Sequence, residues 1–197
     1  MKDKISMNPF DMETLAVKCA NNDLSGVTMT GHSIDRIYKN GVLVDEIVGH
    51  NLVVNSFLNL IMCLLKGEKN GGALYSGIQY WAVGSGASSW DTNMPSPALD
   101  NTTLTAELGR VAISPDEISF LDSAYNKVSY PTNIIQISHS FGVSDCNGVW
   151  REFALFGGNA TTDKNSGIMI NKRHHTVITK TNEMTVERIM RFTINLV

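Results

Sequence analysis

Two adjacent histidines, His174 and His175, are of a residue type that binds metal ions and transfers protons. Neighbouring residues of a strand point to opposite faces, so one metal ion cannot easily bind both side chains. Lys172 and Arg173 precede the pair and would repel a cation. We therefore interpret this segment as the exposed end of a strand or a loop.

A third histidine, His139, alternates with Ile135, Ile137 and Phe141 on what the pattern indicates is a core face. This favours a partly buried, hydrogen-bonded histidine over a catalytic base. The carboxylates are scattered, and no G-x-S-x-G, H-E-x-x-H, G-x-x-x-x-G-K-[ST] or D-x-D-x-D-G pattern occurs. The sequence therefore predicts that the protein is not an enzyme and that it binds no metal.

Two glycines, Gly84 and Gly86, imitate the start of a dinucleotide-binding loop. The third glycine is missing, and prolines follow in place of the apolar pattern of a helix. We interpret this segment as a turn at the end of a strand, and no cofactor is predicted.

The three cysteines, Cys19, Cys63 and Cys146, are widely spaced, and none belongs to a C-x-x-C pair. A disulfide framework and a zinc site are both disfavoured. Cys63 lies in an apolar run, where a buried and unreactive thiol is expected.

Residues 1–10 lack the apolar core of a signal peptide, and no apolar stretch approaches the ~20 residues that span a bilayer. We expect synthesis and folding in a cytoplasm, without membrane insertion.

The length of the chain, 197 residues, fits one domain with a small appendage. Charged residues make up 18% of the chain, below the usual ~25%, and the formal net charge is −3. A protein that binds nucleic acid through phosphate contacts would need a basic excess, which excludes this class of partner. Asn, Ser, Thr and Gly are better represented than Lys and Glu, as is typical of a β-rich surface.

The clearest local pattern is a β-hairpin over residues 33–48, in which Asn40-Gly41 separates two alternating runs. Asn-Gly accepts the positive φ angles of a type I′ turn. An amphipathic helix is predicted at about 53–66, because apolar residues recur there at steps of three and four. Lys66 and Gly67 suit the carboxyl-terminal end of that helix.

Short strands separated by turn residues are expected over most of the remaining chain. They lie at about 77–84, 117–121, 133–142, 149–156, 167–171, 175–179 and 184–196, and residues 103–110 fit a helical turn or an irregular strand. The last strand has an apolar face that only Arg188 interrupts. Many short strands indicate a mainly β fold, an antiparallel β-sandwich with one helix packed on it. The predicted organisation is an N-terminal arm or peripheral segment at 1–30 and a single β-sandwich domain at 31–197.

Several longer motifs follow one another in a recognisable order. IYKNGVLVDEIVGHNLVVNSFLNLIMCLL precedes YWAVGSGASSW. ALDNTTLTAELGR then resembles a D-x-x-L-x-x-E-x-x-R pattern through Asp100, Thr103, Leu104, Glu107 and Arg110, with Leu104 one position later than in the pattern. WREFALFGG is close to an I-R-E-x-G-L-F strand, and IMINKRHHTVITKTNEMTVERIMRFTI closes the series. Over residues 34–196 the chain thereby resembles a family of small virion proteins of tailed bacteriophages. It departs from that family at three places. The loop at 87–101 is longer, Ala154 stands where the family commonly has Gly, and Met190 stands where Trp is frequent.

The resemblance implies a structural protein of the virion, made in the bacterial host cytoplasm and located in the tail, baseplate, fibre-attachment region or neck. Its partners would be further copies of itself, as a trimer or ring, and other virion proteins; neither nucleic acid nor a membrane is expected. A capsid decoration (head-fibre) protein is one alternative. Few charges would suit surfaces that other subunits cover, because burying charge costs desolvation energy.

A second alternative is a receptor-binding or glycan-binding fibre module, with a host glycan as partner. The aromatic residues Tyr80, Trp81, Trp90 and Trp150 could form a platform for a sugar, although such residues are more often core or interface anchors. For the interface with other virion proteins we predict Trp81, Trp90 and Leu104, together with the N-terminal arm.

Overall fold

The hairpin predicted around Asn40-Gly41 is confirmed in the computed structural model, which describes residues 15–17, 27–66 and 69–196. Its strands are β2 (Val27–Lys39) and β3 (Val42–Val53), and together they extend beyond the predicted 33–48 at both ends. The φ angles of Asn40 and Gly41 are 50° and 76°, the positive values that a type I′ turn requires. One β-bulge interrupts the pairing close to the tip of the hairpin.

Replacing Gly41 with alanine is expected to lower the free energy of unfolding by about 1 kcal/mol, because an L-residue is strained at positive φ. A Cβ added at Gly41 would have no neighbour within 4 Å, so the cost comes from the backbone alone. Gly77→Ala is the matched control, since a Cβ is equally free of contacts there and the φ of Gly77 is not positive. Urea denaturation of both variants measures the difference, and equal stabilities would contradict the turn assignment.

Ten strands of the described chain form one antiparallel sheet in the order β7-β6-β11-β12-β3-β2-β13-β10-β8-β9, and β1 (Leu15–Val17) pairs with β2 beside this path. The other bounds are β6 (Ser76–Gly84), β7 (Glu107–Ala112), β8 (Ile118–Leu121), β9 (Lys127–Val128), β10 (Ile134–Phe141), β11 (Gly148–Gly158), β12 (Ile168–Lys180) and β13 (Met184–Leu196). A separate two-stranded sheet joins β4 (Lys69–Asn70) to β5 (Ala73–Leu74).

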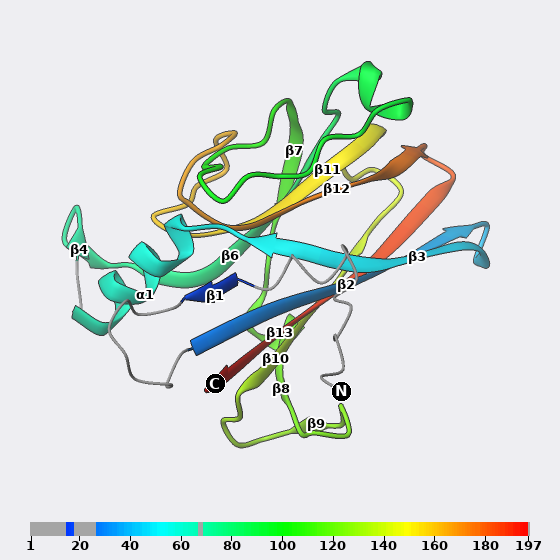
Figure 1. The fold of residues 1–197 in the computed structure, drawn as a ribbon. Helices are drawn as coiled ribbons and strands as arrows, with labels where there is room; N and C mark the ends of the chain where they lie inside the picture. The colour runs from blue at the N-terminus through cyan, green and yellow to red at the C-terminus, as the bar shows by residue number, and fades with distance from the viewer. Residues whose placement is uncertain (1–14, 18–26, 67–68, 197) are drawn as a thin grey trace, which may run out of the picture.

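The main sheet curls into a half-barrel whose two halves join through β3 and β12 (Figure 1). β3 pairs with β2 as far as Asn51 and then crosses to β12, which it meets in only two residue pairs, at Leu52 and Val53. β1 pairs with β2 opposite residues 27–29, next to the point where β3 has left. On the other side of the crossing β3 and β12 no longer pair, and Arg173 of β12 reaches across to the backbone oxygen of Val48.

The prediction of a mainly antiparallel β fold with one helix is confirmed, but the prediction of a β-sandwich is wrong. Alternation of apolar and polar residues shows only that one face of a strand is buried. It does not distinguish burial against a second sheet from burial against the other half of the same sheet. β3 makes the difference here, because it belongs to both halves and joins them into one sheet.

The concave face of the half-barrel holds the core. Trp81 of β6 and both Trp150 and Phe153 of β11 are fully buried, as are Phe141 of β10 and Met190 of β13. The aromatic rings meet edge to face, and the centroids of Phe141 and Trp150 are 5.1 Å apart. The inward face predicted for the last strand is confirmed at Val186, Met190 and Phe192, whereas Ile194, farther along the same face, is 39% exposed.

The predicted helix is confirmed as α1 (Ser56–Lys66). It begins at Ser56 and not at about residue 53, because residues 51–53 complete β3. The Ser56 hydroxyl donates to the backbone oxygen of Met169 over 2.6 Å, which attaches the start of the helix to β12. The helix lies at one end of the half-barrel (Figure 1).

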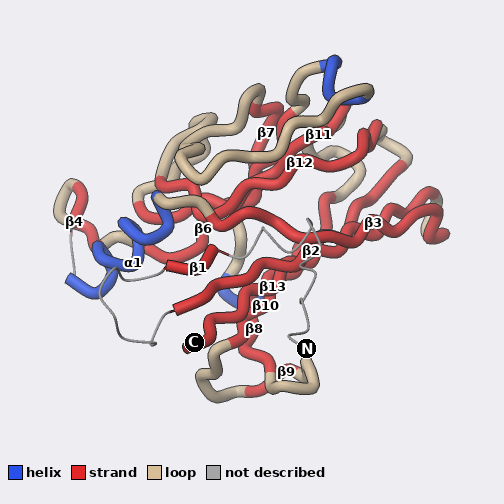
Figure 2. Tube along the Cα trace, viewed as in Figure 1, coloured by secondary structure: helices blue, strands red, loops and turns tan. Residues whose placement is uncertain are grey.

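Three other segments were assigned less precisely by the sequence patterns (Figure 2). Residues 167–171 and 175–179 belong to a single strand, β12, because the polar residues between them have partners inside the fold. Residues 103–106 form bends without regular secondary structure and β7 begins at Glu107, which fits the irregular strand that was one of the two alternatives for 103–110. The predicted arm at 1–30 lies mainly outside the described residues; β1 and the first residues of β2 are the parts of it that the structure describes.

Candidate assembly surface

Of the three residues predicted for an interface, two are buried and only Trp90 is near the surface. Trp81 is fully buried and packs edge-on against Phe153, with ring centroids 5.7 Å apart. Leu104 is 2% exposed and belongs to a second cluster of buried residues. Both side chains therefore stabilise the fold and offer no surface to another molecule. For Trp90, which is half-buried, the interface role stays a prediction.

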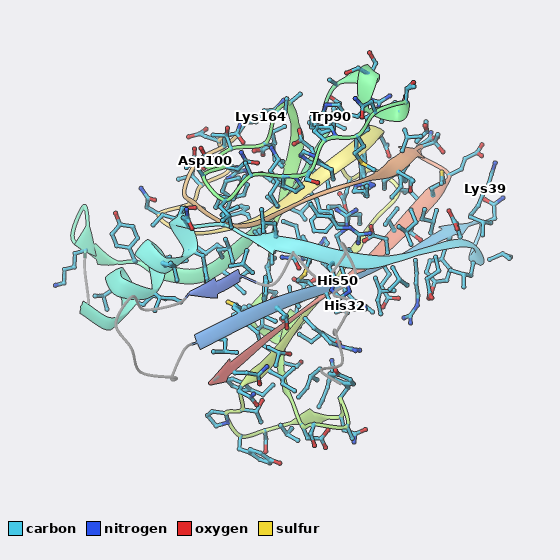
Figure 3. All side chains as sticks on the ribbon, viewed as in Figure 1. His32, Lys39, His50, Trp90, Asp100 and Lys164 are labelled. Atoms are coloured by element: carbon cyan, nitrogen blue, oxygen red, sulfur yellow. The ribbon has the colours of Figure 1, made fainter. Side chains whose placement is uncertain are left out.

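Trp90 lies in the loop between β6 and β7 (Figure 3). Its ring packs against His174 of β12, with 4.2 Å between the ring centroids. Gly86 permits this packing, because a Cβ there would lie 2.5 Å from atoms of the indole ring. Arg151 holds the same loop through a bidentate pair with Asp91, at 2.6 and 2.7 Å. One face of the Trp90 ring is thus occupied within the chain, which leaves less of it for a glycan.

The side chains of His174 and His175 lie on opposite faces of β12, as predicted. The interpretation of this segment as the exposed end of a strand or a loop is wrong. His175 is only 3% exposed, and the preceding Lys172 and Arg173 are 3% and 8% exposed. His174 packs against Trp90, and burial is the main cause that lowers its pKa. These polar residues are buried because each side chain meets a partner from another strand or loop.

The free energy of unfolding should decrease as the pH is lowered, because of His175. Burial lowers the pKa of this histidine from 6.5 to about 3. The unfolded chain binds a proton below about pH 6.5, whereas the folded chain keeps this imidazole neutral. Between the two pKa values the group removes up to about 1.4 kcal/mol of stability for each pH unit of acidification. His175→Gln should flatten this part of the profile, as measured by urea denaturation from neutral to acidic pH. Parallel profiles for the two proteins would contradict this assignment.

Glu107 and Arg110 of β7 form a buried bidentate pair with distances of 2.7 and 2.8 Å. Arg110 also donates to the backbone oxygen of Thr161 over 3.0 Å, and Glu107 accepts from the backbone N–H of Asn165 over 2.6 Å. The E-x-x-R part of the motif thus joins β7 to the loop between β11 and β12. Asp100, which begins the motif, is exposed (Figure 3).

Glu152 of the WREFALFGG motif is fully buried on β11. Its carboxylate accepts from the backbone N–H groups of Thr105 and Ala106, at 3.1 and 2.9 Å. Lys172 lies 3.1 Å from the same carboxylate and also donates to the backbone oxygen of Thr103. Glu152 and Lys172 together fix the segment that leads into β7.

A third buried ion pair, between Arg188 of β13 and Asp35 of β2, lies in the middle of the core. Arg188 donates from Nε and Nη2 to the two carboxylate oxygens of Asp35, at 2.6 and 3.0 Å. Aromatic rings surround the guanidinium, with the centroids of Phe153 and Trp150 at 4.0 and 5.4 Å. The rings supply cation–π attraction where water is excluded.

Sequence reasoning missed this pair, although a signal was present. Arg188 shares the inward phase of Val186 and Met190 along β13, and Asp35 shares the inward phase of Ile37 along β2. Each of these two residues of opposite charge lies on the buried face of its strand, so the sequence could have predicted that they form an ion pair. By itself, the pattern of β13 shows Arg188 only as an interruption of the apolar face.

The remaining candidates for chemistry are separate from one another. His139 is partly buried, as predicted, with its Nδ1 2.6 Å from the carboxylate of Glu117. Burial raises the pKa of the Cys146 thiol, which disfavours the reactive thiolate; Cys19 and the side chain of Cys63 lie outside the described residues. Within the described ranges, no three His, Cys, Asp or Glu side chains converge to hold a metal ion. No helix in those ranges has the length and apolar character needed to cross a bilayer.

Several apolar residues that remain exposed gather on the β2–β3 hairpin. Val42, Leu43 and Val44 follow the turn and are 66%, 48% and 55% exposed, and we call them the hairpin tip surface. The tip lies at the periphery of the molecule, next to Lys39 (Figure 3). Consecutive exposed apolar residues at such a position are typical of a contact with another protein.

The chain matches no known protein-family model, and comparison with curated proteins finds no significant match.

Proposed function

We propose that this protein is a structural component of a bacteriophage virion, in the tail, baseplate, fibre-attachment region or neck. It assembles there through contacts with further copies of itself and with other virion proteins. The virion part of this proposal is supported by the order of the motifs over residues 34–196. Three of the residues that carry those motifs, Glu107, Arg110 and Glu152, make buried contacts that hold loops to the sheet, as a scaffold requires.

The observation that carries the assembly part is the hairpin tip surface. Val42, Leu43 and Val44 are exposed, whereas Glu152, Arg188 and other charged residues are buried within the same chain. Leaving three apolar side chains in water forgoes the hydrophobic stabilisation that their burial would contribute. A protein partner that covers the tip in the assembled particle would recover it.

Electron microscopy of intact particles, labelled with gold-conjugated antibody against this chain, tests the proposal. Label on the tail, baseplate or neck is the expected result. Label spread over the head would favour a capsid decoration protein instead. Absence of the chain from purified particles, together with no binding of the purified protein to them, would overturn the proposal.

A further inference from the structure

Two histidines face one another across the β2–β3 hairpin, close to the point where β3 leaves β2. His32 of β2 is paired with His50 of β3, and the pairing of the two strands ends at the next residue pair, Gly31 with Asn51. Both side chains lie on the outer face of the sheet, because Ser33 and Asn51, which alternate with them, are buried. Figure 3 shows the two rings next to one another.

The backbone brings these two side chains closer than most cross-strand neighbours. In an antiparallel pair of strands, residue pairs that exchange backbone hydrogen bonds alternate with pairs that do not, and side chains are closer in the second kind. The carbonyl oxygen of Val48 accepts from Arg173 of β12 over 3.3 Å, so Val48 turns its backbone groups away from β2. His50, two residues farther along, has the same orientation, and its pair with His32 is therefore of the closer kind.

The distance between the two rings suits one metal ion held between them. The ring centroids are 5.3 Å apart, and the ring planes are inclined by 80°. Two imidazoles that bind one tetrahedral ion through nitrogen, at about 2.0–2.1 Å, have their centroids roughly 5 Å apart. His50 is exposed, so rotation of its side chain can direct a nitrogen toward the ion without a movement of the backbone.

The nitrogen atoms of both rings are available as ligands. Within the part of the chain that the structure describes, neither ring makes a hydrogen bond or an ion pair. Burial lowers the pKa of His32, and His50, Arg191 and Arg173 lower it further, so this imidazole is neutral at neutral pH. The neutral form is the one that binds a metal, because a proton and a metal ion compete for the same lone pair.

The two arginines near the pair are directed toward other groups. The Nε of Arg191 donates to Gln136 over 2.8 Å, and its Cζ lies 4.5 Å from the centroid of the Tyr125 ring. Arg173 donates to the backbone oxygen of Val48. Their positive charges oppose a cation that binds by charge alone, such as Ca²⁺ or Mg²⁺. The pair therefore favours an ion that imidazole binds strongly, namely Cu²⁺, Ni²⁺ or Zn²⁺.

We propose that His32 and His50 together bind one divalent transition-metal ion of the class Cu²⁺, Ni²⁺ or Zn²⁺ on the outer face of the half-barrel. Water fills the remaining coordination positions in the isolated chain. The ion joins β2 to β3 directly before β3 crosses to β12 at Leu52, so it reinforces the connection between the two halves of the sheet. The sequence motifs do not indicate this site, because its two ligands belong to different strands. The site is independent of the proposed virion role.

Titration of the untagged full chain with Cu²⁺, supplied as its neutral iminodiacetate complex, tests the site. Electron paramagnetic resonance should show one Cu²⁺ that is bound by two imidazole groups. His50→Ala should weaken the binding at least about 10-fold and leave one imidazole on the ion, because the second ring no longer completes the chelate. His32→Gln should have the same effect from the other strand.

Two further measurements separate metal binding from folding. His50 is exposed, so His50→Ala should keep the circular dichroism spectrum and the melting temperature of the parent when no metal is present. Zn²⁺ should raise the melting temperature of the parent more than that of His50→Ala, because an ion that binds only the folded chain stabilises it. His139→Gln is the matched control, since His139 lies on β10 with its Nδ1 2.6 Å from Glu117, and it should leave copper binding unchanged.

Equal copper binding by the parent and by His50→Ala would overturn the metal site, as would a spectrum with a single imidazole in the parent. An equal loss of binding in His139→Gln would also overturn it, because the ion would then lie elsewhere. These results leave the virion role untouched, since the labelling of intact particles tests that role separately.

Discussion

Replacing Arg188 with methionine is expected to lower the free energy of unfolding by about 3–5 kcal/mol, the cost of leaving a buried charge without its partner. Methionine is apolar and flexible enough to fill much of the space, but the fully buried Asp35 carboxylate would lose both of its hydrogen bonds to the guanidinium. The cation 4.0 Å from the centroid of Phe153 is lost as well. Urea denaturation followed by circular dichroism measures the change.

Removing both charges separates the cost of an unpaired carboxylate from the contribution of the pair. The double variant D35L/R188M leaves no buried charge and should recover most of the stability that R188M loses. Arg36→Met is the matched control, because Arg36 pairs with Glu46 and Glu187 at a position where its side chain is 35% exposed. It should change the free energy of unfolding by no more than about 1 kcal/mol. A double variant as unstable as R188M would contradict the role assigned to Asp35.

Local patterns predicted the elements of this fold well. The turn chemistry of Asn40-Gly41 and the alternation on either side of it specify the hairpin, because both act over neighbouring residues. The same holds for α1, whose apolar stripe recurs at helical spacing, and for the alternating β13. In each case the signal comes from residues that are adjacent in the element itself.

Contacts between distant residues are only partly within the reach of such patterns. Asp35 and Arg188 are 153 positions apart. The alternation shows that each lies on the buried face of its strand, but neither strand alone identifies the other as its partner. The crossing of β3 from β2 to β12 rests on two residue pairs, and it decides between a sandwich and one curled sheet. The polar run at 172–175 suggested exposure only because its partners come from other parts of the chain.

The candidate site shows the same limit. Tryptophan is common both in cores and in interfaces, so residue type could not separate the buried Trp81 from the half-buried Trp90. The exposed valines of the hairpin tip alternate and follow a turn, as valines in a buried strand would also do. They are exposed because no other part of the described chain covers the tip, which depends on the arrangement of distant elements.

Glu152→Ala should destabilise the fold about as strongly as R188M, by about 3–5 kcal/mol, because Glu152 balances a buried lysine. Its loss would leave the backbone N–H groups of Thr105 and Ala106 without their acceptor and Lys172 without a counter-charge. Urea denaturation measures the global loss. Hydrogen exchange should show, in addition, that the amides of Thr105 and Ala106 lose protection more than the rest of the sheet.

Two further variants give this prediction its control. Glu152→Gln keeps a carbonyl acceptor in nearly the same place but loses the charge, so its stability should fall between those of the parent and Glu152→Ala. Glu183 pairs with Lys39 at 3.4 Å with its own side chain 62% exposed. Glu183→Ala should therefore change the free energy of unfolding by less than about 1 kcal/mol. If Glu152→Ala costs no more than Glu183→Ala, the segment before β7 is held by its own backbone contacts, such as Ser85 N–H to Ala106 O at 2.9 Å, and the carboxylate is not what fixes it.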